Sequence, residues 1–253
     1  MPKNTDFYKA PRYLFRKLNI LRITKKLDAK TFLDVGCGAG ELACSLAESG
    51  MKGIAVDFSE DAIAVAENLR KQRGIDGKQL NFKLGGLENV KGKKFDLVSC
   101  YEVLEHIKDD KALLKELITY SNKYVLISVP AKQKLFDASD EAVGHFRRYE
   151  KKNLIKMLES QGLQILEFSN YGYPFTDAVR VGRKVFFKVK LRRDGGASMK
   201  NRSKESGINP IKIPTKLTKI NLEKPIVPLY HASRLFNRYN LSEGYLVLCQ
   251  KKK

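Results

Sequence analysis

Long apolar runs, histidines and cysteines are all scarce in this chain of 253 residues. No apolar run approaches the ~18 residues that suggest a membrane-spanning helix. Residues 1–16 are interrupted by charges, which is not the pattern of a signal peptide, so we expect a cytoplasmic protein. The cysteines show no paired ligand spacing, which predicts reduced thiols and no zinc site. We predict no other metal site, with the pair Glu102 and His106 as the open alternative. The four cysteines are Cys37, Cys44, Cys100 and Cys249.

Acidic residues are few relative to basic ones. Only 28 Asp and Glu stand against 48 Lys and Arg, which gives a formal net charge of +20. Such an imbalance indicates an anionic partner, namely a nucleic acid, an anionic membrane surface or an acidic substrate. A generally solubilising surface is the alternative. The charge carries no information about the fold.

Short apolar runs alternate with helical patterns along most of the chain. This alternation predicts an α/β protein with helices on both faces of a parallel sheet, whose ligands lie outside the carboxyl ends of the strands. The length suits a single domain with a large insertion. The expected strands are 31–35, 53–57, 80–84, 94–99, 123–129, 163–169 and 244–250; the expected helices are 40–49, 59–72, 109–121 and 150–161.

The segment Leu-Asp-Val-Gly-Cys-Gly-Ala-Gly at residues 33–40 carries the most information about function. Glycines at this spacing let the backbone turn sharply and approach a ligand closely, where a strand meets a helix N-terminus. A second apolar run, 54–56, ends in Asp57. A carboxylate at the tip of the neighbouring strand can accept hydrogen bonds from both hydroxyls of a ribose. Together these features predict a ligand that contains a nucleoside.

The glycine pattern also separates the candidate ligands. A dinucleotide fingerprint reads Gly-x-Gly-x-x-Gly, and a phosphate loop requires Gly-Lys-Ser/Thr. This chain instead has Gly-x-Gly-x-Gly followed by Glu41. An acid at that point would repel a pyrophosphate but suits a ligand with an ammonium or sulfonium charge.

Three segments together resemble one enzyme family. Residues 33–40 resemble motif I of the class I S-adenosylmethionine-dependent methyltransferases, and Val-Asp-Phe-Ser at 56–59 resembles their second motif. Residues 95–106 (Phe-Asp-Leu-Val-Ser-Cys-Tyr-Glu-Val-Leu-Glu-His) resemble the fourth-strand motif of the ubiquinone-biosynthesis-like branch, methyltransferase types 11 and 23. The resemblance covers about residues 30–170. It implies a Rossmann-like, doubly wound sheet of seven strands, the last antiparallel, with a large insertion between the last two strands.

The resemblance further implies that S-adenosylmethionine is the cofactor. The glycine turn is expected to hold its amino-acid end, Asp57 its ribose, and Phe58 to lie along its adenine. Relatives carry an Asp for the adenine amino group where this chain has Gly86. Either the backbone around Gly86 and Leu87 suffices, or that contact is lost. The expected cofactor contacts are Asp34, Gly36, Cys37, Gly38, Gly40, Asp57, Phe58, Gly86, Leu87, Cys100 and Tyr101, of which the last two line the floor beneath the sulfonium.

Two later segments carry candidate acid–base groups. Glu102 and His106 share one face if their segment is helical, either as a metal-binding or acid–base pair or as packing under the cofactor. Residues 140–149 resemble a segment on the acceptor side of related methyltransferases. There, His145 is the candidate catalytic residue, because a histidine suits a general base for a hydroxyl. The expected acceptor contacts are Glu141, Arg147, Arg148 and Tyr149; an acid–Arg network that only shapes the loop is the alternative.

Two further segments are expected to cover the site. Residues 1–29 contain apolar residues at helical spacing and are interpreted as a helical lid or as a helix packed on the sheet. Residues 171–243 are a basic insertion. Within it, the apolar residues Phe175, Val179, Gly182, Phe186 and Val189 share a stripe, while Arg180, Arg183, Lys184, Lys188, Lys190, Arg192 and Arg193 cover the rest. Such a helix can lie on an anionic membrane or cover an acceptor, or can simply pack on the sheet.

The sequence thus predicts methyl transfer from S-adenosylmethionine, with oxygen of a small-molecule or lipid-linked acceptor preferred by family analogy alone. A peripheral contact with the inner face of an anionic membrane is expected. An RNA methyltransferase is the second hypothesis, although no RNA-binding module or amino-methylation motif is present. A non-catalytic protein that binds cofactor or membrane is the third.

Overall fold

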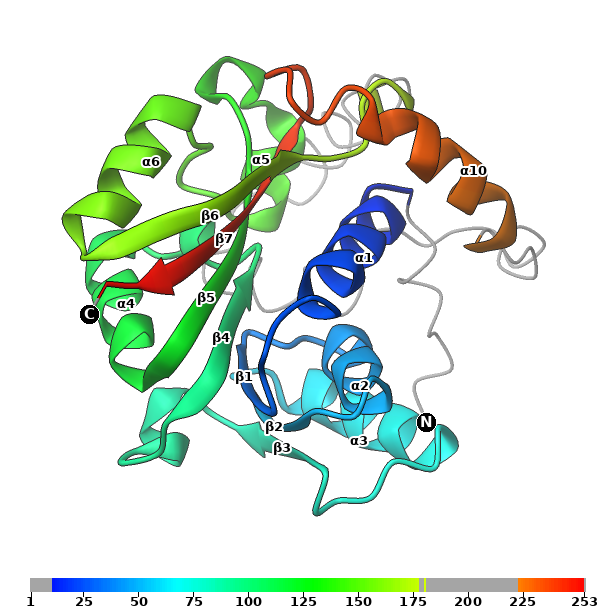
Figure 1. Cartoon of the computed structure of the whole chain (residues 1–253), viewed down its shortest axis with the longest axis vertical. Coiled ribbons are helices and arrows are strands. Elements are labelled where there is room, and N and C mark those ends of the chain that lie inside the picture. The colour runs from blue at the N-terminus through cyan, green and yellow to red at the C-terminus, as the bar shows by residue number, and fades with distance from the viewer. Residues whose placement is uncertain (1–10, 178–179, 181–222, 253) are drawn as a thin grey trace.

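The computed structural model describes residues 11–177, 180 and 223–252, which form a seven-stranded sheet covered by helices on both faces (Figure 1). The strand order is β3-β2-β1-β4-β5-β7-β6, and β7 runs antiparallel to both neighbours while the other pairs are parallel. The strands are β1 (Thr31–Val35), β2 (Lys52–Asp57), β3 (Leu80–Leu84), β4 (Phe95–Tyr101), β5 (Ser121–Pro130), β6 (Leu163–Asn170) and β7 (Gly244–Lys251).

The helices connect these strands in the expected order. They are α1 (Pro11–Thr24), α2 (Glu41–Glu48), α3 (Glu60–Gln72), α4 (Asp110–Tyr120), α5 (Ala138–Val143), α6 (Lys151–Ser160) and α10 (Glu223–Arg234). The doubly wound sheet with an antiparallel last strand is confirmed, and the expected bounds of its strands and of the helices between them hold to within two residues. The short helix α5 had no counterpart among the predicted elements.

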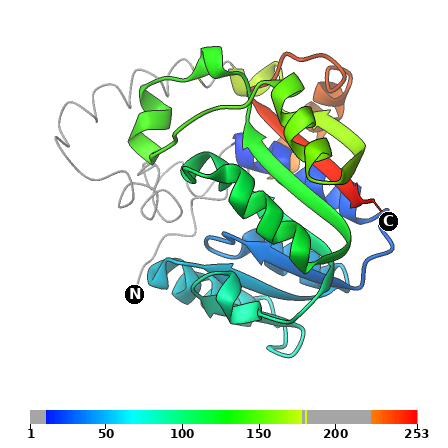
Figure 2. The same ribbon diagram turned by 90° about the vertical axis from the view of Figure 1, so that its left-hand side faces the viewer.

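Two apolar layers hold the sheet between its helices, because successive side chains of a strand point to opposite faces. Phe32 of β1 packs in the layer beneath α1, α2 and α3, whereas the adjacent Leu33 packs in the layer beneath α4 and α6. Figure 2 shows the two helical layers flanking the twisted sheet. The central strands are thus covered on both faces, whereas the edge strands β3 and β6 keep exposed side chains such as Leu84 and Leu166.

The helices α1 and α10 pack against each other on one face of the sheet (Figure 1). Phe15 of α1 is fully buried and stacks on Phe175, with 6.0 Å between ring centroids, and its ring also lies 6.5 Å from that of Tyr230 in α10. Phe175, expected in the apolar stripe of the insertion, therefore packs against α1. The rest of that stripe, and the basic residues from 181 onwards, lie outside the described residues. In the described part of the chain, no helix is both long and apolar enough to cross a membrane.

Candidate functional site

The carboxyl ends of the five parallel strands β1 to β5 meet at one edge of the sheet. From β1 the chain continues to β2 and β3 on one side, then returns to β4 and β5 on the other. The ends of β1 and β4 therefore form the topological switch point, where α/β sheets of this kind bind their ligands. The glycine turn, Asp57, Gly86 and the loops that contain His106 and His145 all follow these strand ends.

The turn after β1 requires glycine for both conformation and space. Gly36, Gly38 and Gly40 have φ angles of +73°, +52° and +77°, in the left-handed region that other residues rarely adopt. A methyl group at Gly36 would lie 2.4 Å from Cγ2 of Val103, and one at Gly40 would lie 2.6 Å from the Phe82 ring. The loop after β4, which contains Val103, thus packs directly on the turn.

Asp57 ties the end of β2 to this turn. The Gly38 N–H donates to Oδ2 of Asp57 at 2.8 Å, and the Ser59 N–H donates to Oδ1 at 2.9 Å. An ionised carboxylate has about four lone-pair positions, so each oxygen keeps the capacity to accept one further hydrogen bond. The carboxylate is therefore held in one orientation over the turn, as a ribose-binding acid must be.

Phe58 explains why residue 86 is glycine. Its side chain is 66% exposed, which is unusual for a phenylalanine, and a methyl group at Gly86 would lie 2.7 Å from its Cζ atom. The Gly86 N–H donates to Oε1 of Glu88 at 2.6 Å, which fixes the backbone before the buried Leu87. The aspartate that relatives carry at position 86 would not fit this arrangement without movement of Phe58.

Asp34 is an acid buried at the end of β1. Burial raises its pKa to about 7, although the Ser99 hydroxyl donates to Oδ1 at 2.7 Å and Arg16 favours the ionised form. Glu41 differs, because it forms ion pairs with Lys17 of α1 and Arg73. These cations compensate the charge of Glu41, so its attraction for a cationic ligand stays a prediction. Asp34 and Asp57 lie beside the turn without an ion-pair partner among the described residues.

Cys100 and Tyr101 are the last two residues of β4 and point to opposite faces. Cys100 packs in the layer beneath α4 and α6, and Tyr101 packs in the layer beneath α1. Both are buried, and burial raises the pKa of each well above its usual value. Because the two side chains lie on opposite faces of the sheet, they cannot both line one floor beneath a cofactor. A role of the backbone of Cys100 and Tyr101 in lining that floor stays a prediction.

The segment after β4 is not the continuous helix on which the pairing of Glu102 with His106 depended. Glu102 has a φ of +57°, and only Leu104–His106 form a short 3-10 turn. The Glu102 carboxylate points to α1, where Arg12 lies at 2.6 Å and Arg16 at 3.5 Å. These ion pairs hold the pKa of Glu102 at about 2 in spite of its burial.

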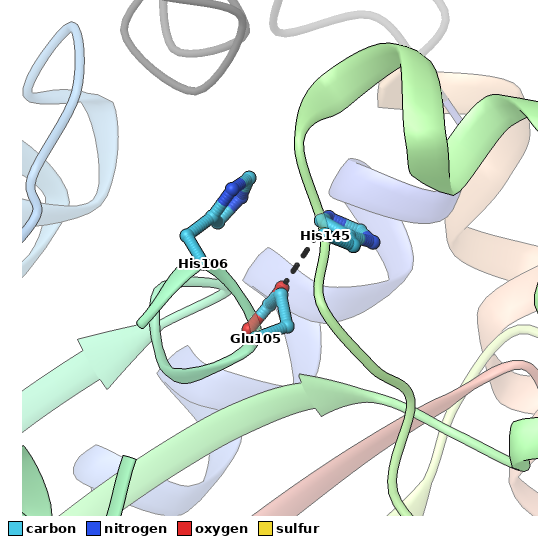
Figure 3. Close-up of side chains that lie close together, drawn as sticks. All are labelled: Glu105, His106 and His145. Carbon is cyan, nitrogen blue, oxygen red and sulfur yellow. Dashed lines mark ion pairs between the residues drawn. The ribbon is translucent and has the colours of Figure 1, made fainter. Parts of the chain in front are cut away.

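The structure instead brings His106 and His145 together with Glu105 (Figure 3). The two imidazole rings meet edge to face, with 4.7 Å between centroids, and the Phe146 N–H donates to the Glu105 carbonyl oxygen at 2.8 Å. Glu105 is fully buried, and burial together with the neighbouring Glu102 raises its pKa well above the usual value. Burial and the neighbouring His145 lower the pKa of His106 to about 4, so this imidazole is neutral near pH 7.

His145 is anchored by Asp140, the first acid of the segment for which an acid–Arg network was the alternative. Nδ1 of His145 lies 2.7 Å from Oδ1 of Asp140, and Nε of Arg148 donates to Oδ2 of the same carboxylate at 2.8 Å. Burial would raise the pKa of Asp140, but its hydrogen bond with His145 and the charge of Arg148 lower it to about 2. An ionised carboxylate can only accept, so Nδ1 of His145 is the donor to Asp140, and Nε2 is the ring nitrogen that faces Glu105.

The remaining predicted acceptor contacts separate into two groups. Arg148 is buried on Asp140, and the Tyr149 hydroxyl donates to Asp110 at 2.7 Å, so both contribute to the acid–Arg network that was the alternative. Arg147 also pairs with Asp110, at 2.9 Å, but its side chain is 30% exposed. Glu141 is exposed at the surface of α5. Contact of Glu141, Arg147, Arg148 or Tyr149 with an acceptor stays a prediction.

Sequence comparison relates the chain to methyltransferases. A family model described as a methyltransferase domain matches residues 8–167. Over 182 residues the chain is 26% identical to the ubiquinone biosynthesis O-methyltransferase of Coxiella burnetii (strain Dugway 5J108-111), an alignment that covers 64% of this chain and 76% of that protein.

Structural comparison gives the same fold in proteins of different activity. Magnesium protoporphyrin IX methyltransferase (ChlM) from Synechocystis PCC 6803, with bound SAH, superimposes with a TM-score of 0.54 at 21% identity, over 65% of this chain and 81% of that one. The [4+2]-cyclase SpnF superimposes with a TM-score of 0.58 at 14% identity, over 95% of this chain and 81% of that one. These likenesses show the fold alone, so the chemistry must be argued from the site.

Proposed function

This chain belongs to the methyltransferase family whose model spans residues 8–167, and we propose that it transfers a methyl group from S-adenosylmethionine to an oxygen of a small-molecule or lipid-linked acceptor. The observation that carries the proposal is the glycine turn held by Asp57 at the switch point of the sheet. The ChlM structure with bound SAH supports the choice of cofactor. The curated O-methyltransferase relative supports oxygen as the acceptor atom.

The residues of the turn fit this cofactor. Asp57 would hold the ribose, and the exposed Phe58 ring would lie along the adenine beside the backbone of Gly86. Asp34, buried without an ion pair of the kind that neutralises Glu41, suits the ammonium of the amino-acid end. When bound, the cofactor supplies an electrophilic methyl group on a sulfonium. The protein has to position the acceptor and take up its proton.

His145 is the residue proposed to orient the acceptor oxygen or to accept its proton. Its Nδ1 is engaged with Asp140, and its Nε2 faces the loop after β4. Val103 of that loop packs on Gly36 of the turn, so the two candidate subsites adjoin. A hydroxyl acceptor bound there would lie between the imidazole and the cofactor end of the turn. Asp140 and Arg148 act as positioning residues, because they contact the imidazole rather than the acceptor.

The cofactor assignment is tested by binding of S-adenosylmethionine and S-adenosylhomocysteine in a calorimeter. Asp57→Ala should weaken both by at least tenfold, about 1.4 kcal/mol, because the turn loses its anchor and the ribose its acceptor. Glu116→Ala, which removes an exposed acid from α4, is the matched control and should bind like the unmodified chain. Tight binding of NAD with no binding of either methyl-donor compound would contradict the proposal.

Cofactor affinity should also depend on pH through Asp34. Because its pKa is about 7, the acid is mostly protonated at pH 6 and cannot attract an ammonium; it ionises as the pH rises. The groups that face it are Arg16 of α1, Asp57 of β2 and the Ser99 hydroxyl of β4. Affinity should therefore be about tenfold weaker at pH 6 than at pH 7.5, with proton release on binding. Asp34→Asn should bind weakly and equally at both values; an equal affinity in the unmodified chain would rule out this role for Asp34.

An anionic membrane is the proposed place of contact with a lipid-linked acceptor, since each basic residue near such a surface adds about 1 kcal/mol. Binding to phosphatidylglycerol vesicles should be strong at low salt, fall at high salt, and fall when Arg183, Lys184 and Lys188 become Glu. Reversal of the exposed Lys111, Lys115 and Lys152 on α4 and α6 is the control with the same charge change. Failure to bind vesicles, with steeply salt-dependent binding of structured RNA, would instead favour an RNA methyltransferase.

A further inference from the structure

Three side chains from two loops converge beside the proposed acceptor position. Glu105 and His106 come from the loop after β4 and His145 from the loop after α5, and one donor atom of each lies within 4.8 Å of the others (Figure 3). We propose that Glu105, His106 and His145 bind one divalent transition-metal ion, which in turn binds the acceptor oxygen. The role toward the acceptor rests on the proposed function, whereas the cation site itself rests on these side chains alone.

Glu105 gives the strongest indication that something binds there. Its side chain is fully buried, and within the described part of the chain neither carboxylate oxygen has a hydrogen-bond partner. Leaving a buried acceptor without a hydrogen-bond partner is unfavourable, and more so for a charged group. The nearest cationic candidate, Nε2 of His145, is 3.8 Å from Oε1, which is too long for a hydrogen bond. A cation between them would satisfy the carboxylate.

The spacing of the donors is close to that of a metal site. Ligand atoms that each lie about 2.0–2.2 Å from one zinc ion are about 3–3.5 Å apart. The 3.8 Å between Oε1 of Glu105 and Nε2 of His145 therefore has to close by a few tenths of an ångström, and the widest separation in the cluster, which reaches up to 4.8 Å, by up to about 1.5 Å. The ring of His106 stands at 78° to that of His145, so the two imidazoles approach the shared space from different directions.

The surroundings of His145 are those of a metal-ligating histidine. Such a histidine usually donates its other ring N–H to a carboxylate, which fixes the ring and leaves the remaining nitrogen as a ligand. Here Asp140 lies 2.7 Å from Nδ1 and is held in turn by Arg148. The nitrogen directed at Glu105 is therefore Nε2, the one with its lone pair available.

The donor set determines which ions fit. Two imidazoles and one carboxylate suit Zn²⁺ or Mn²⁺, whereas Mg²⁺ prefers a shell of oxygens. Three protein ligands leave a coordination position open, as in catalytic rather than structural sites. An acceptor hydroxyl bound at that position would lose its proton more readily. The neighbouring acid Glu102 is paired with Arg12 and is therefore not one of the proposed ligands. The three proposed ligands then include a single carboxylate, that of Glu105.

The test is titration of the full chain, stripped with EDTA, with Zn²⁺ and with Mn²⁺ in a calorimeter. One ion per chain is expected to bind. Glu105→Gln and His106→Gln should each weaken binding by at least ~100-fold, and Asp140→Asn by ~10–100-fold through the orientation of His145. Two matched controls, His231→Gln on α10 and Glu116→Gln on α4, remove exposed residues of the same types and should bind like the unmodified chain.

Two results would overturn the site: no saturable binding of either ion below ~1 mM, or equal binding by Glu105→Gln, His106→Gln and the unmodified chain. Circular dichroism and S-adenosylmethionine affinity establish that each variant is folded. If the buried substitution Glu105→Gln prevents folding, His106→Gln alone tests the cation site. Cofactor binding is measured separately, so loss of the cation site leaves the proposed methyl transfer standing. Binding of a cation without binding of S-adenosylmethionine would contradict the proposed methyl transfer but would support the cation site.

Discussion

His145→Ala is expected to lower turnover by ~10²–10⁴, the range typical for loss of a group that handles a proton or fixes the reacting atom. Cofactor affinity should stay near normal, because His145 lies in the loop after α5 and the contacts of the glycine turn do not involve it. Turnover is measured as transfer of a labelled methyl group to an acceptor fraction of a cell extract, and affinity by calorimetry. A fall in kcat with an unchanged cofactor Kd is the expected pattern.

The controls for this variant separate chemistry from packing. His231→Ala removes an exposed histidine from α10 and should leave turnover unchanged. Asp140→Asn keeps the shape of the positioning residue but removes its charge, so it should lower kcat by less than His145→Ala does. An unchanged rate in His145→Ala would assign His145 a purely structural role and make His106 the next candidate for the acceptor group.

The fold could be predicted from the sequence because its signals are local. Each strand of the sheet is a short apolar run, and each connecting helix begins after a turn or capping residue such as Ser59 or Asp109, whose side chains accept hydrogen bonds from the first helical turn. The glycine turn was predictable for the same reason, since three positive φ angles require three glycines. The antiparallel last strand came from family resemblance rather than from periodicity.

The contacts between distant segments were not predictable in this way. Spacing alone assigned Glu102 and His106 to one helical face, but the left-handed conformation of Glu102 ends any helix there and turns its carboxylate toward α1. Its partner Arg12 is 90 residues earlier in the chain. Glu105 appeared only as part of a motif, and its place beside His145 depends on the loop after α5. Its position next to His106 was the one local signal that could have identified it.

The second large effect is expected on stability, from removal of Glu102, the glutamate that pairs with Arg12 and Arg16 of α1. Glu102→Ala should lower the free energy of unfolding by about 3–5 kcal/mol, the range for removing one partner of a buried ion pair. The substitution leaves the guanidinium groups of Arg12 and Arg16 buried without their carboxylate, and the hydroxyls of Ser128 and Tyr171 lose their acceptor. Urea unfolding at neutral pH, followed by circular dichroism, measures the change.

A more exposed ion pair of α1 provides the matched comparison. Arg22 pairs with Glu167 of β6, but this acid is 33% exposed and screened by solvent, so Glu167→Ala should cost no more than about 1 kcal/mol. The double variant Arg12→Ala/Glu102→Ala should be less destabilised than the sum of its two single variants, because it no longer leaves one charge buried opposite a missing partner. If Glu102→Ala and Glu167→Ala lower the free energy of unfolding by the same amount, the ion pair of Glu102 does not contribute more than an exposed pair to holding α1 in place. α1 would then be held mainly by its apolar contacts and by its ion pairs with Glu41 and Glu167.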